Sequence, residues 1–390
     1  MLHNIIFFFT NAKLHIYSFL LFISTFLWMA LPYNSGPDIA IQKWVGAIRM
    51  LIPDRYKPAP NELIFIDVSK SKYLVPLNED STENDVITNR KYLTELFSFL
   101  KANDNQVKYV LCDVNFDIPT TDDGAFIQSV SGLKDKFLSI DTYANDSLMK
   151  NVVGVRSATA SIYLQNRTVY KIPFFGNCGE PLVPLKMYTD LDKVNVRKNF
   201  LFTWFSDKGI AFNSQVNDYS VRSSDFTSGG YVKIGLGELI SILKLSPEVF
   251  KRYLQNRYLL IGDFENDQHI TYLNIQPGTL ILFNAYLHLH LNLQLLPVWY
   301  LIILYIFLYW IVWLQTGKRS RRLKFTLKIK YFETFKIPVN ILSVSFLLMI
   351  FTFLSSLLFH INISVFHLIA IFSFVDLVKF IWNKRIPVNT

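Results

Sequence analysis

Four long apolar runs dominate the pattern of hydrophobic and polar positions along the chain. They cover residues 14–31, 296–314, 339–359 and 365–382. Each approaches the ~20 residues that an α-helix needs to cross ~30 Å of hydrocarbon. The pattern therefore predicts four transmembrane helices. We interpret the first as an uncleaved anchor, because its apolar stretch exceeds the ~7–15 residues of a cleaved signal sequence.

The segment between the first two runs, residues 33–295, has a different pattern. It opens with a connector containing Pro and Gly over residues 33–60 and then alternates short apolar runs with stretches of helical spacing. The predicted strands are residues 63–68, 107–116, 137–140, 152–155 and 258–263, with shorter ones at 168–173, 200–205 and 210–213. The predicted helices are residues 90–100, 236–245, 247–254 and 277–295, and another begins at Asp122-Asp123. Alternating strands and helices predict an α/β domain with a mostly parallel mixed sheet.

Charge is distributed unevenly over these segments. The chain is 51% hydrophobic, has a mean hydropathy of +0.26 and carries a net charge of +9. Residues 296–390 hold eleven Lys/Arg and two Asp/Glu, whereas residues 33–295 hold 27 basic and 28 acidic residues. A nucleic-acid-binding domain would carry its own basic face, so we expect no nucleic-acid partner.

The basic residues beside the apolar runs predict the orientation. The loop over residues 315–338 holds eight Lys/Arg against one acid, Glu333. Short basic loops stay in the cytoplasm, and such a loop also suits anionic lipid head groups. We therefore expect the N-terminus (1–13), this loop and the tail (383–390) to be cytoplasmic, and residues 33–295 to form an extracytoplasmic domain. Asp376 and Lys379, near the cytoplasmic end of the last run, are expected to pair and snorkel.

The chain contains two cysteines, Cys112 and Cys178. Cys112 lies in an apolar run, which predicts a buried small hydrophobic residue. A disulfide with Cys178 remains an alternative in an oxidising compartment.

Three sequence blocks resemble the CHASE2 family, which are extracytoplasmic sensory domains of bacterial receptors. They are Ile66-Asp67-Val68-Ser69; Val110 to Asp117 followed by Asp122-Asp123; and Leu260-Ile261-Gly262-Asp263 followed by Asp267-x-His269-x-Thr271, Pro277-Gly278 and Asn284-Ala285. One apolar run before the domain and three after it also resemble that family. The resemblance implies a multi-pass protein of the bacterial inner (cytoplasmic) membrane with a periplasmic domain that senses a ligand.

The sequence departs from the family in two respects. Leu74-Val75-Pro76 stands where the family usually has Trp-Pro, and no kinase or cyclase domain follows the last apolar run. We therefore expect a sensory module that signals through a separate partner protein. The alternative is a structural or assembly subunit of a cell-envelope complex, with the outer domain as a docking surface. A homodimer is compatible with either.

Polar residues that follow predicted strands form the candidate site. In open α/β sheets, ligands bind beyond the carboxyl ends of the strands, and carboxylates suit cations or small polar ligands. The candidate ligand-binding residues are Asp67, Asp113, Asp117, Asp267, His269 and Thr271. The alternative is that these residues cap helices and close turns, as Asp and Thr do routinely.

No motif predicts catalysis. The chain lacks Gly-x-Ser-x-Gly, His-Glu-x-x-His and a Gly-rich phosphate loop. His288 and His290 lie two apart and would face different sides of a helix. We therefore expect no catalytic residues, no metal site and no cofactor, and a protein that is not an enzyme.

Overall fold

The computed structural model describes most of the chain, and its described part divides into two compact units. The described residues are 12–31, 35–51, 57–76, 84–103, 106–144, 147–149, 151–162, 164–165, 167–206, 208–228, 230–316 and 339–373. The helical unit comprises Met1–Leu51, Asn199–Phe212 and Gln294–Thr390, and the α/β unit comprises Ile52–Lys198 and Asn213–Leu293. The predicted outer domain thus supplies residues 36–51 and 199–212 to the helical unit.

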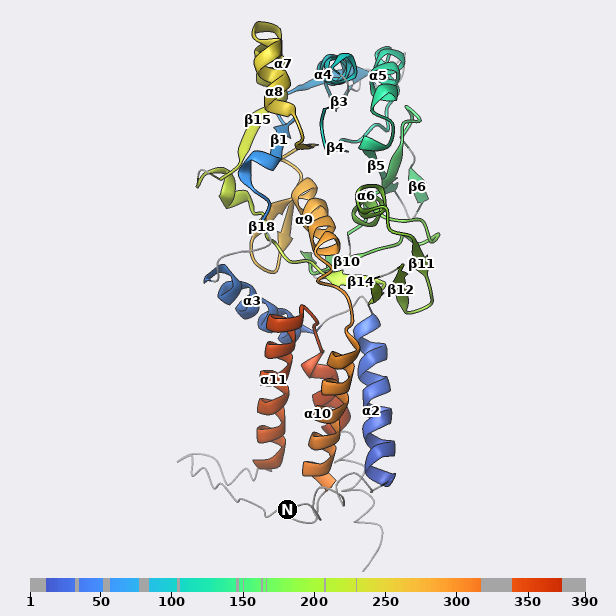
Figure 1. Cartoon of the computed structure of the whole chain (residues 1–390), viewed down its shortest axis with the longest axis vertical. Coiled ribbons are helices and arrows are strands. Elements are labelled where there is room, and N and C mark those ends of the chain that lie inside the picture. Colours follow the sequence, from blue (N-terminus) through green and yellow to red (C-terminus); the bar gives the residue numbers. More distant parts are fainter. Residues whose placement is uncertain are drawn as a thin grey trace, which may run out of the picture. The chain divides into compact units, whose positions relative to one another are not determined.

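A mostly parallel sheet forms the centre of the α/β unit (Figure 1). Its strand order is β15-β1-β16-β4-β5-β6, and β7 pairs with β5. The strands are β1 (Leu63–Asp67), β4 (Tyr109–Asp113), β5 (Phe137–Ala144), β6 (Ser147–Met149), β7 (Ser157–Thr159), β15 (Val232–Gly235) and β16 (Tyr258–Gly262). Only the β5–β6 pair is antiparallel among the described pairs of this sheet. The predicted α/β fold with a mostly parallel sheet is confirmed.

Helices cover both faces of the sheet, which is why its central strands read as continuous apolar runs. One face packs against α4 (Arg90–Ala102), α5 (Asp123–Val130), α7 (Leu236–Leu245) and α8 (Pro247–Leu254). The other face packs against α6 (Val183–Asp192) and α9 (Gly278–His290). On that face the hydroxyl groups of Tyr258 and Tyr286 lie 3.1 Å apart, and the Tyr109 hydroxyl donates to Asp190 Oδ2 at 2.7 Å.

Shorter elements surround the sheet. The hairpin of β2 (Lys72–Pro76) and β3 (Asn84–Thr88) follows β1. The others are β8 (Leu164–Gln165), β9 (Thr168–Val169), β10 (Lys171–Pro173), β11 (Val196–Lys198), β14 (Ser214–Val216), β17 (Gln268–Thr271) and β18 (Ile275–Pro277), with 3₁₀ turns at Pro60–Glu62, Ser131–Lys136 and Ser223–Phe226.

The strand predicted at residues 152–155 is wrong. The chain turns there, because Gly154 adopts a left-handed conformation with φ of +62°. Val153 is buried at the turn, and the Val152 amide donates to the Phe116 carbonyl at 2.8 Å. A buried apolar residue in a turn gives the same short apolar pattern as a strand. The strand of this region is β7 instead.

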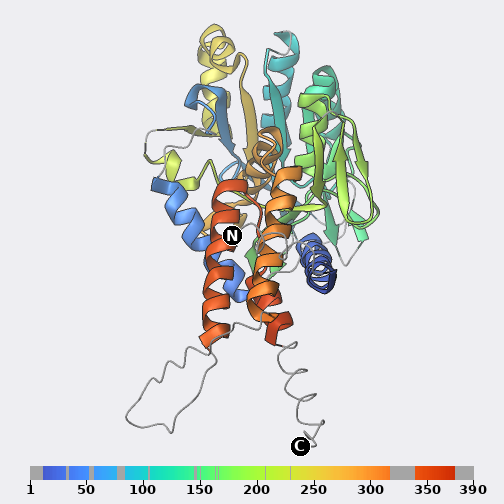
Figure 2. The ribbon, with the colours of Figure 1, turned by 60° about the horizontal axis from the view of Figure 1, so that its bottom comes forward.

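The helical unit contains α2 (Ala12–Ala30), α3 (Gly36–Leu51), α10 (Val298–Thr316) and α11 (Val339–Phe359), a helical segment at 365–373, and the hairpin of β12 (Phe202–Phe205) and β13 (Gly209–Phe212) (Figure 2). Among the described residues, α2 alone has both the length and the mean hydropathy that a membrane-spanning helix needs. Val298–Leu314 and Val344–Phe359 are shorter apolar stretches. Residues 1–11, 317–338 and 374–390 lie outside the described residues, and with them most of the predicted basic loop, the pair Asp376 and Lys379, and the tail.

Helix α3 replaces part of the predicted connector. Gly36 and Pro37 stand in its first turn, where Pro is tolerated because the first amides have no partner inside the helix. Asp38 accepts a hydrogen bond from the Ser35 amide at 2.9 Å, and the Asp38 amide donates to Ser35 Oγ at 3.4 Å. Pro and Gly therefore mark the start of a helix here rather than an extended linker.

Both cysteines are free thiols. Cys112 is fully buried in β4, as predicted, whereas Cys178 is exposed. The structure thus has no bond between them.

Gly262 should be intolerant of even one added carbon. A Cβ at this position would lie 1.9 Å from Thr279 Oγ1, so Gly262→Ala should lower the free energy of unfolding by about 1–3 kcal/mol. Denaturant unfolding of the detergent-solubilised full chain measures this change. Gly124→Ala in α5 is the matched control, because a Cβ there meets nothing within 4 Å. Equal stability of the two variants would contradict the close approach.

Candidate functional site

A cleft of about 720 Å³ opens at the carboxyl ends of the parallel strands in the α/β unit. Its walls come from the β2–β3 hairpin, the loop after β4, strand β5, the segment after β7 with β8, the turn after β16, strand β17 and the start of α9. Its charged lining residues are Lys72, Asp85, Asp113, Asp117, Asp263, Asp267 and His269. Five carboxylates against one lysine and one histidine make the cleft acidic.

Asp113 lies at the end of β4. Thr279, in the first turn of α9, donates from its hydroxyl to Asp113 Oδ2 at 2.7 Å. Burial, together with the negative charge of Asp267, raises the pKa of Asp113 to about 7, and the Thr279 bond opposes this shift only in part. Asp113 can therefore exchange a proton near neutral pH, which an ordinary aspartate does not do.

Asp267 and His269 form a pair on the next wall. His269 Nε2 lies 2.9 Å from Asp267 Oδ1. The hydrogen bond to Asp267 raises the pKa of His269 above its ordinary value against the opposing effect of burial, and the charge of Asp113 adds to the rise. Gly278 allows this pair to approach the start of α9, because a Cβ there would lie 2.1 Å from Asp267 Oδ2.

Asp117 reaches the cleft on the loop after β4. It is exposed and accepts a hydrogen bond from Asn115 Nδ2 at 2.8 Å, and Asn115 also lines the cleft. The structure therefore brings four of the six predicted residues to one cleft: Asp113, Asp117, Asp267 and His269.

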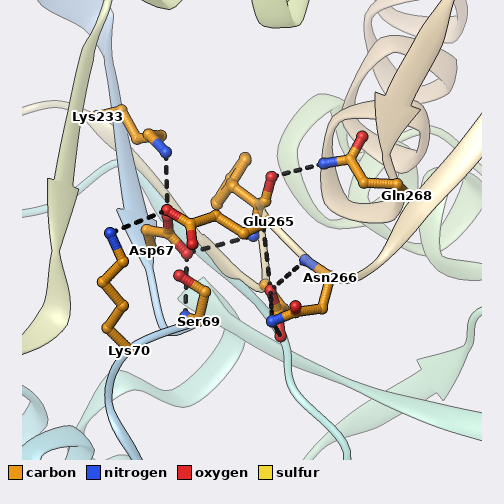
Figure 3. A network of polar contacts seen from close by, with 9 residues as sticks. Asp67, Ser69, Lys70, Lys233, Glu265, Asn266 and Gln268 are labelled. Carbon is orange, nitrogen blue, oxygen red and sulfur yellow. Dashed lines mark hydrogen bonds and ion pairs between the residues drawn. The ribbon is translucent and has the colours of Figure 1, made fainter.

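The other two predicted residues serve the fold. Asp67 is 6% exposed and accepts from the amides of Ser69 at 3.0 Å and Phe264 at 3.3 Å (Figure 3). Lys233 Nζ lies 3.0 Å from its second oxygen. Burial acts to raise the pKa of Asp67, but the bonds from Ser69 and Lys233 lower it below its ordinary value. Asp67 thus ties the turn after β1 to the turn after β16.

Thr271 closes a turn and does not line the cleft. Its hydroxyl donates to the Asn274 carbonyl at 2.6 Å and accepts from the Asn274 amide at 3.1 Å. The side chain is buried between β17 and β18. For Asp67 and Thr271 the turn-closing alternative describes the structure.

Lys72 is a cleft residue that the sequence reasoning missed. It stands at the start of the β2–β3 hairpin and forms an ion pair with Asp263, which follows β16. Burial acts to raise the pKa of Asp263, but the bonds from Lys72 and Asn266 hold it below its ordinary value. The pair fixes the base of the hairpin against the sheet edge. Asp263 stands in the third block of the family resemblance, and that was the one available signal.

Arg90 was also missed, and it positions the loop that carries Asp117. The side chain is 1% exposed, donates to Thr120 Oγ1 at 3.1 Å and pairs with Asp123. Its guanidinium lies 5.3 Å from the centre of the Phe116 ring. A buried arginine that bonds the second half of the loop and lies against the Phe116 ring restricts the positions that the loop can take.

Comparisons were made with protein-family models, with curated proteins and with solved structures. None of the three finds a match to this chain. The geometry of the cleft therefore carries the functional argument.

The raised pKa of Asp113 should make stability depend on pH. The folded chain keeps this proton from about pH 4 to about pH 7 while the unfolded chain releases it, so stability should fall as pH rises through that window. His269 contributes stability that is likewise lost as pH rises through its raised pKa. Asp113→Asn should therefore reduce this loss of unfolding free energy by roughly 2–4 kcal/mol. Denaturant unfolding at a series of pH values measures the change.

Asp117→Asn is the control for this experiment, because it removes an exposed carboxylate from the same cleft. It should leave the wild-type slope in place. A slope in Asp113→Asn equal to that of the wild type would show that Asp113 ionises as an ordinary aspartate.

Proposed function

We propose that this protein is a membrane-anchored extracytoplasmic sensory module of the CHASE2 type, which binds a ligand in the acidic cleft and acts through a separate partner protein. The observation that carries the proposal is the convergence of Asp113, Asp117, Asp267 and His269 on one cleft of about 720 Å³. This volume lies in the ~300–1,000 Å³ range of small-molecule sites. The cleft also opens where ligands enter α/β sheets, beyond the carboxyl ends of the strands.

The charge of the cleft defines the class of ligand. Five carboxylates face Lys72 and His269, and Lys72 is already paired with Asp263. A positively charged ligand would relieve the repulsion between Asp113 and Asp267, whereas an anion would add to it. The ligand is therefore a cation, either a hard divalent ion or a small organic amine. Thr88, Thr142 and Ser161 also line the cleft, but among the described residues none of their hydroxyl groups is bonded to His269 or Asp113, which could activate it as a nucleophile. The proposal is therefore binding rather than catalysis.

The membrane arrangement of the proposal has four spans with both termini in the cytoplasm. Support comes from α2, which meets the length and hydropathy of a span, and from the apolar stretches of α10 and α11. Large apolar side chains on these helices are exposed, among them Leu20 (60%), Ile302 (54%) and Phe346 (63%). Lipid contact would account for this exposure. In a bacterial cell with two membranes, the α/β unit would lie in the periplasm.

One observation favours the alternative, a structural or assembly subunit that docks through its outer domain. Leu245 (83% exposed) is the last residue of α7, and Val249 (65% exposed) lies four positions later in the first turn of α8. Exposed apolar side chains of this size suit a protein contact. Two exposed side chains are weaker support than four charged residues that converge on one cleft, so the sensory proposal is preferred.

Cations should stabilise the protein through the cleft. At a concentration of 100 times Kd, a ligand raises the free energy of unfolding by about 2.7 kcal/mol. Calcium, magnesium and putrescine are the probes, with sulfate as the anionic comparison, and the readout is the unfolding midpoint of the detergent-solubilised chain. The variant Asp113→Asn/Asp267→Asn should lose the response. The control Asp135→Asn removes a 65% exposed carboxylate outside the cleft and should keep it. The absence of any cation response would sink the proposed ligand class.

The orientation can be tested with the natural cysteines. Cys178 is exposed in the α/β unit and Cys112 is fully buried. A membrane-impermeant maleimide should therefore label intact cells, or spheroplasts where an outer membrane intervenes, at Cys178 alone. Cys178→Ser should abolish this labelling. Labelling that appears only after lysis would place the α/β unit in the cytoplasm and refute the orientation.

A further inference from the structure

The β12–β13 hairpin of the helical unit is unusually aromatic. Residues 200–212 contain Phe200, Phe202, Trp204, Phe205 and Phe212. Two of these rings pack against Phe26 of α2: the ring centres of Phe26 and Phe202 are 5.4 Å apart, and those of Phe26 and Phe212 are 5.1 Å apart. One side of the hairpin is therefore fixed to the last turns of α2.

A backbone bond fixes the same hairpin to the approach to α10. The Leu296 amide donates to the Ile210 carbonyl at 2.8 Å. The hairpin is thus held at the ends of two apolar helices, where the chain leaves α2 and enters α10. Phe200 is nevertheless 93% exposed and Trp204 47% exposed. Leaving rings of this size in water forfeits about 1.5–3 kcal/mol each compared with burial.

Helix α3 shows a second outward-facing tryptophan, and its polar residues are turned inward. Asp38 is buried and accepts from the Val365 amide at 3.0 Å and Ser364 Oγ at 2.8 Å, at the start of the helical segment 365–373. Gln42 donates to Ser356 Oγ at 2.5 Å. Trp44 is 70% exposed, and the neighbouring Lys43 is exposed as well. Because the polar bonds fix the rotation of α3, they also fix Trp44 outward.

These elements lie at one end of the helical unit. Ser356 is in the last turn of α11, and Phe359 of that turn packs against Trp299 of the first turn of α10 with ring centres 4.8 Å apart. Trp299 is itself 52% exposed. Exposed tryptophans at Trp44, Trp204 and Trp299 therefore come from three different elements at the same end of the helices.

We propose that α3 and the β12–β13 hairpin form an interfacial collar that contacts lipid at the boundary between head groups and acyl chains of the outer leaflet. Tryptophan concentrates at this boundary, because its ring is apolar and its N–H is polar. Exposed apolar residues continue along α2 to Leu27 (45%), which follows Phe26 in the chain, and to Leu31 (40%) just after the helix, so the collar adjoins the proposed lipid-facing surface. A bilayer contacts every side of a span, which accounts for exposed rings on separate elements better than a protein partner docked at one of them.

The inference rests on the membrane anchoring in the proposed function, and spin labels can separate the two. Nitroxides are attached to single cysteines in a Cys178→Ser background of the full chain, reconstituted in liposomes, while the fully buried Cys112 is retained. The test positions are Phe200→Cys, Trp204→Cys and Trp44→Cys. The controls are Ile302→Cys on α10, 54% exposed, and Leu245→Cys on the α/β unit, 83% exposed. The readout is collision of each label with oxygen, which enters lipid, and with a polar nickel chelate, which does not.

Labels at the three collar positions should collide several-fold less with the nickel chelate than the label at position 245, and less with oxygen than the label at position 302. This result places them at the interface. If position 302 is in lipid but the collar positions match position 245, the collar is refuted and the anchoring stands. If position 302 is also as accessible to the chelate as position 245, the anchoring fails and the collar fails with it.

Discussion

The close approach of β16 to α9 at Gly262 and Thr279 is the constraint on which the rest of the α/β unit depends. Strand β16 lies between β1 and β4 at the centre of the sheet. Because Gly262 has no Cβ, the first turn of α9 reaches the sheet edge, and the Thr279 hydroxyl can bond Asp113 on the neighbouring strand. The packing of one helix and the hydrogen bonding of one carboxyl group therefore depend on the same contact. Gly278, the residue before Thr279, has the same role, because its missing Cβ leaves room for the side chain of Asp267.

The cleft is electrostatically unfavourable when nothing neutralises it. Asp113 and Asp267 repel each other, and burial penalises the charge of Asp113 further. The apolar core on the opposite side of the unit, built by α4, α5, α7 and α8 on the sheet, offsets this cost. In the turn after β1, which does not face the cleft, the charge of Asp67 is neutralised by Lys233 as a close counter-ion. Clustered charges that lower the stability of the fold locally are typical of functional sites.

The sequence allowed prediction of the sheet and of much of the site, for identifiable reasons. Strands buried on both faces read as unbroken apolar runs, so β1, β4 and β16 were found with small errors at their ends. Since parallel strands end at one edge, Asp113, Asp117, Asp267 and His269 could be expected to converge. The same logic included Asp67 and Thr271, which the structure places outside the lining of the cleft, because an aspartate or threonine that closes a turn has the same local sequence as one that faces a cleft.

The remaining features depend on contacts distant in sequence. Lys72 and Asp263 are 191 positions apart, and the short β2–β3 hairpin that carries Lys72 has only weak alternation. In the sequence, Arg90 is indistinguishable from any other residue at the start of a helix. Its role depends on the contact with Thr120 in the loop after β4. Helix α3 was hidden because its Pro and Gly are typical of linkers, although both stand where a helix can begin. That the four apolar runs cross a membrane stays a prediction, and among the described residues α2 alone has the length and hydropathy of a span.

Helix α9 has a mechanical consequence. Its first turn holds the hydroxyl bonded to Asp113, its last residue is His290, and α10 starts at Val298, so seven residues join the two helices. Nearly every side chain of α9 is buried, which makes the helix a stiff rod rather than a pliable connector. A helix that is buried along nearly its whole length cannot shift at Thr279 alone, because a close-packed interior leaves little room for one turn to move by itself. A change at the bond between Thr279 and Asp113 must therefore be accommodated by the packing of the whole of α9 within the α/β unit.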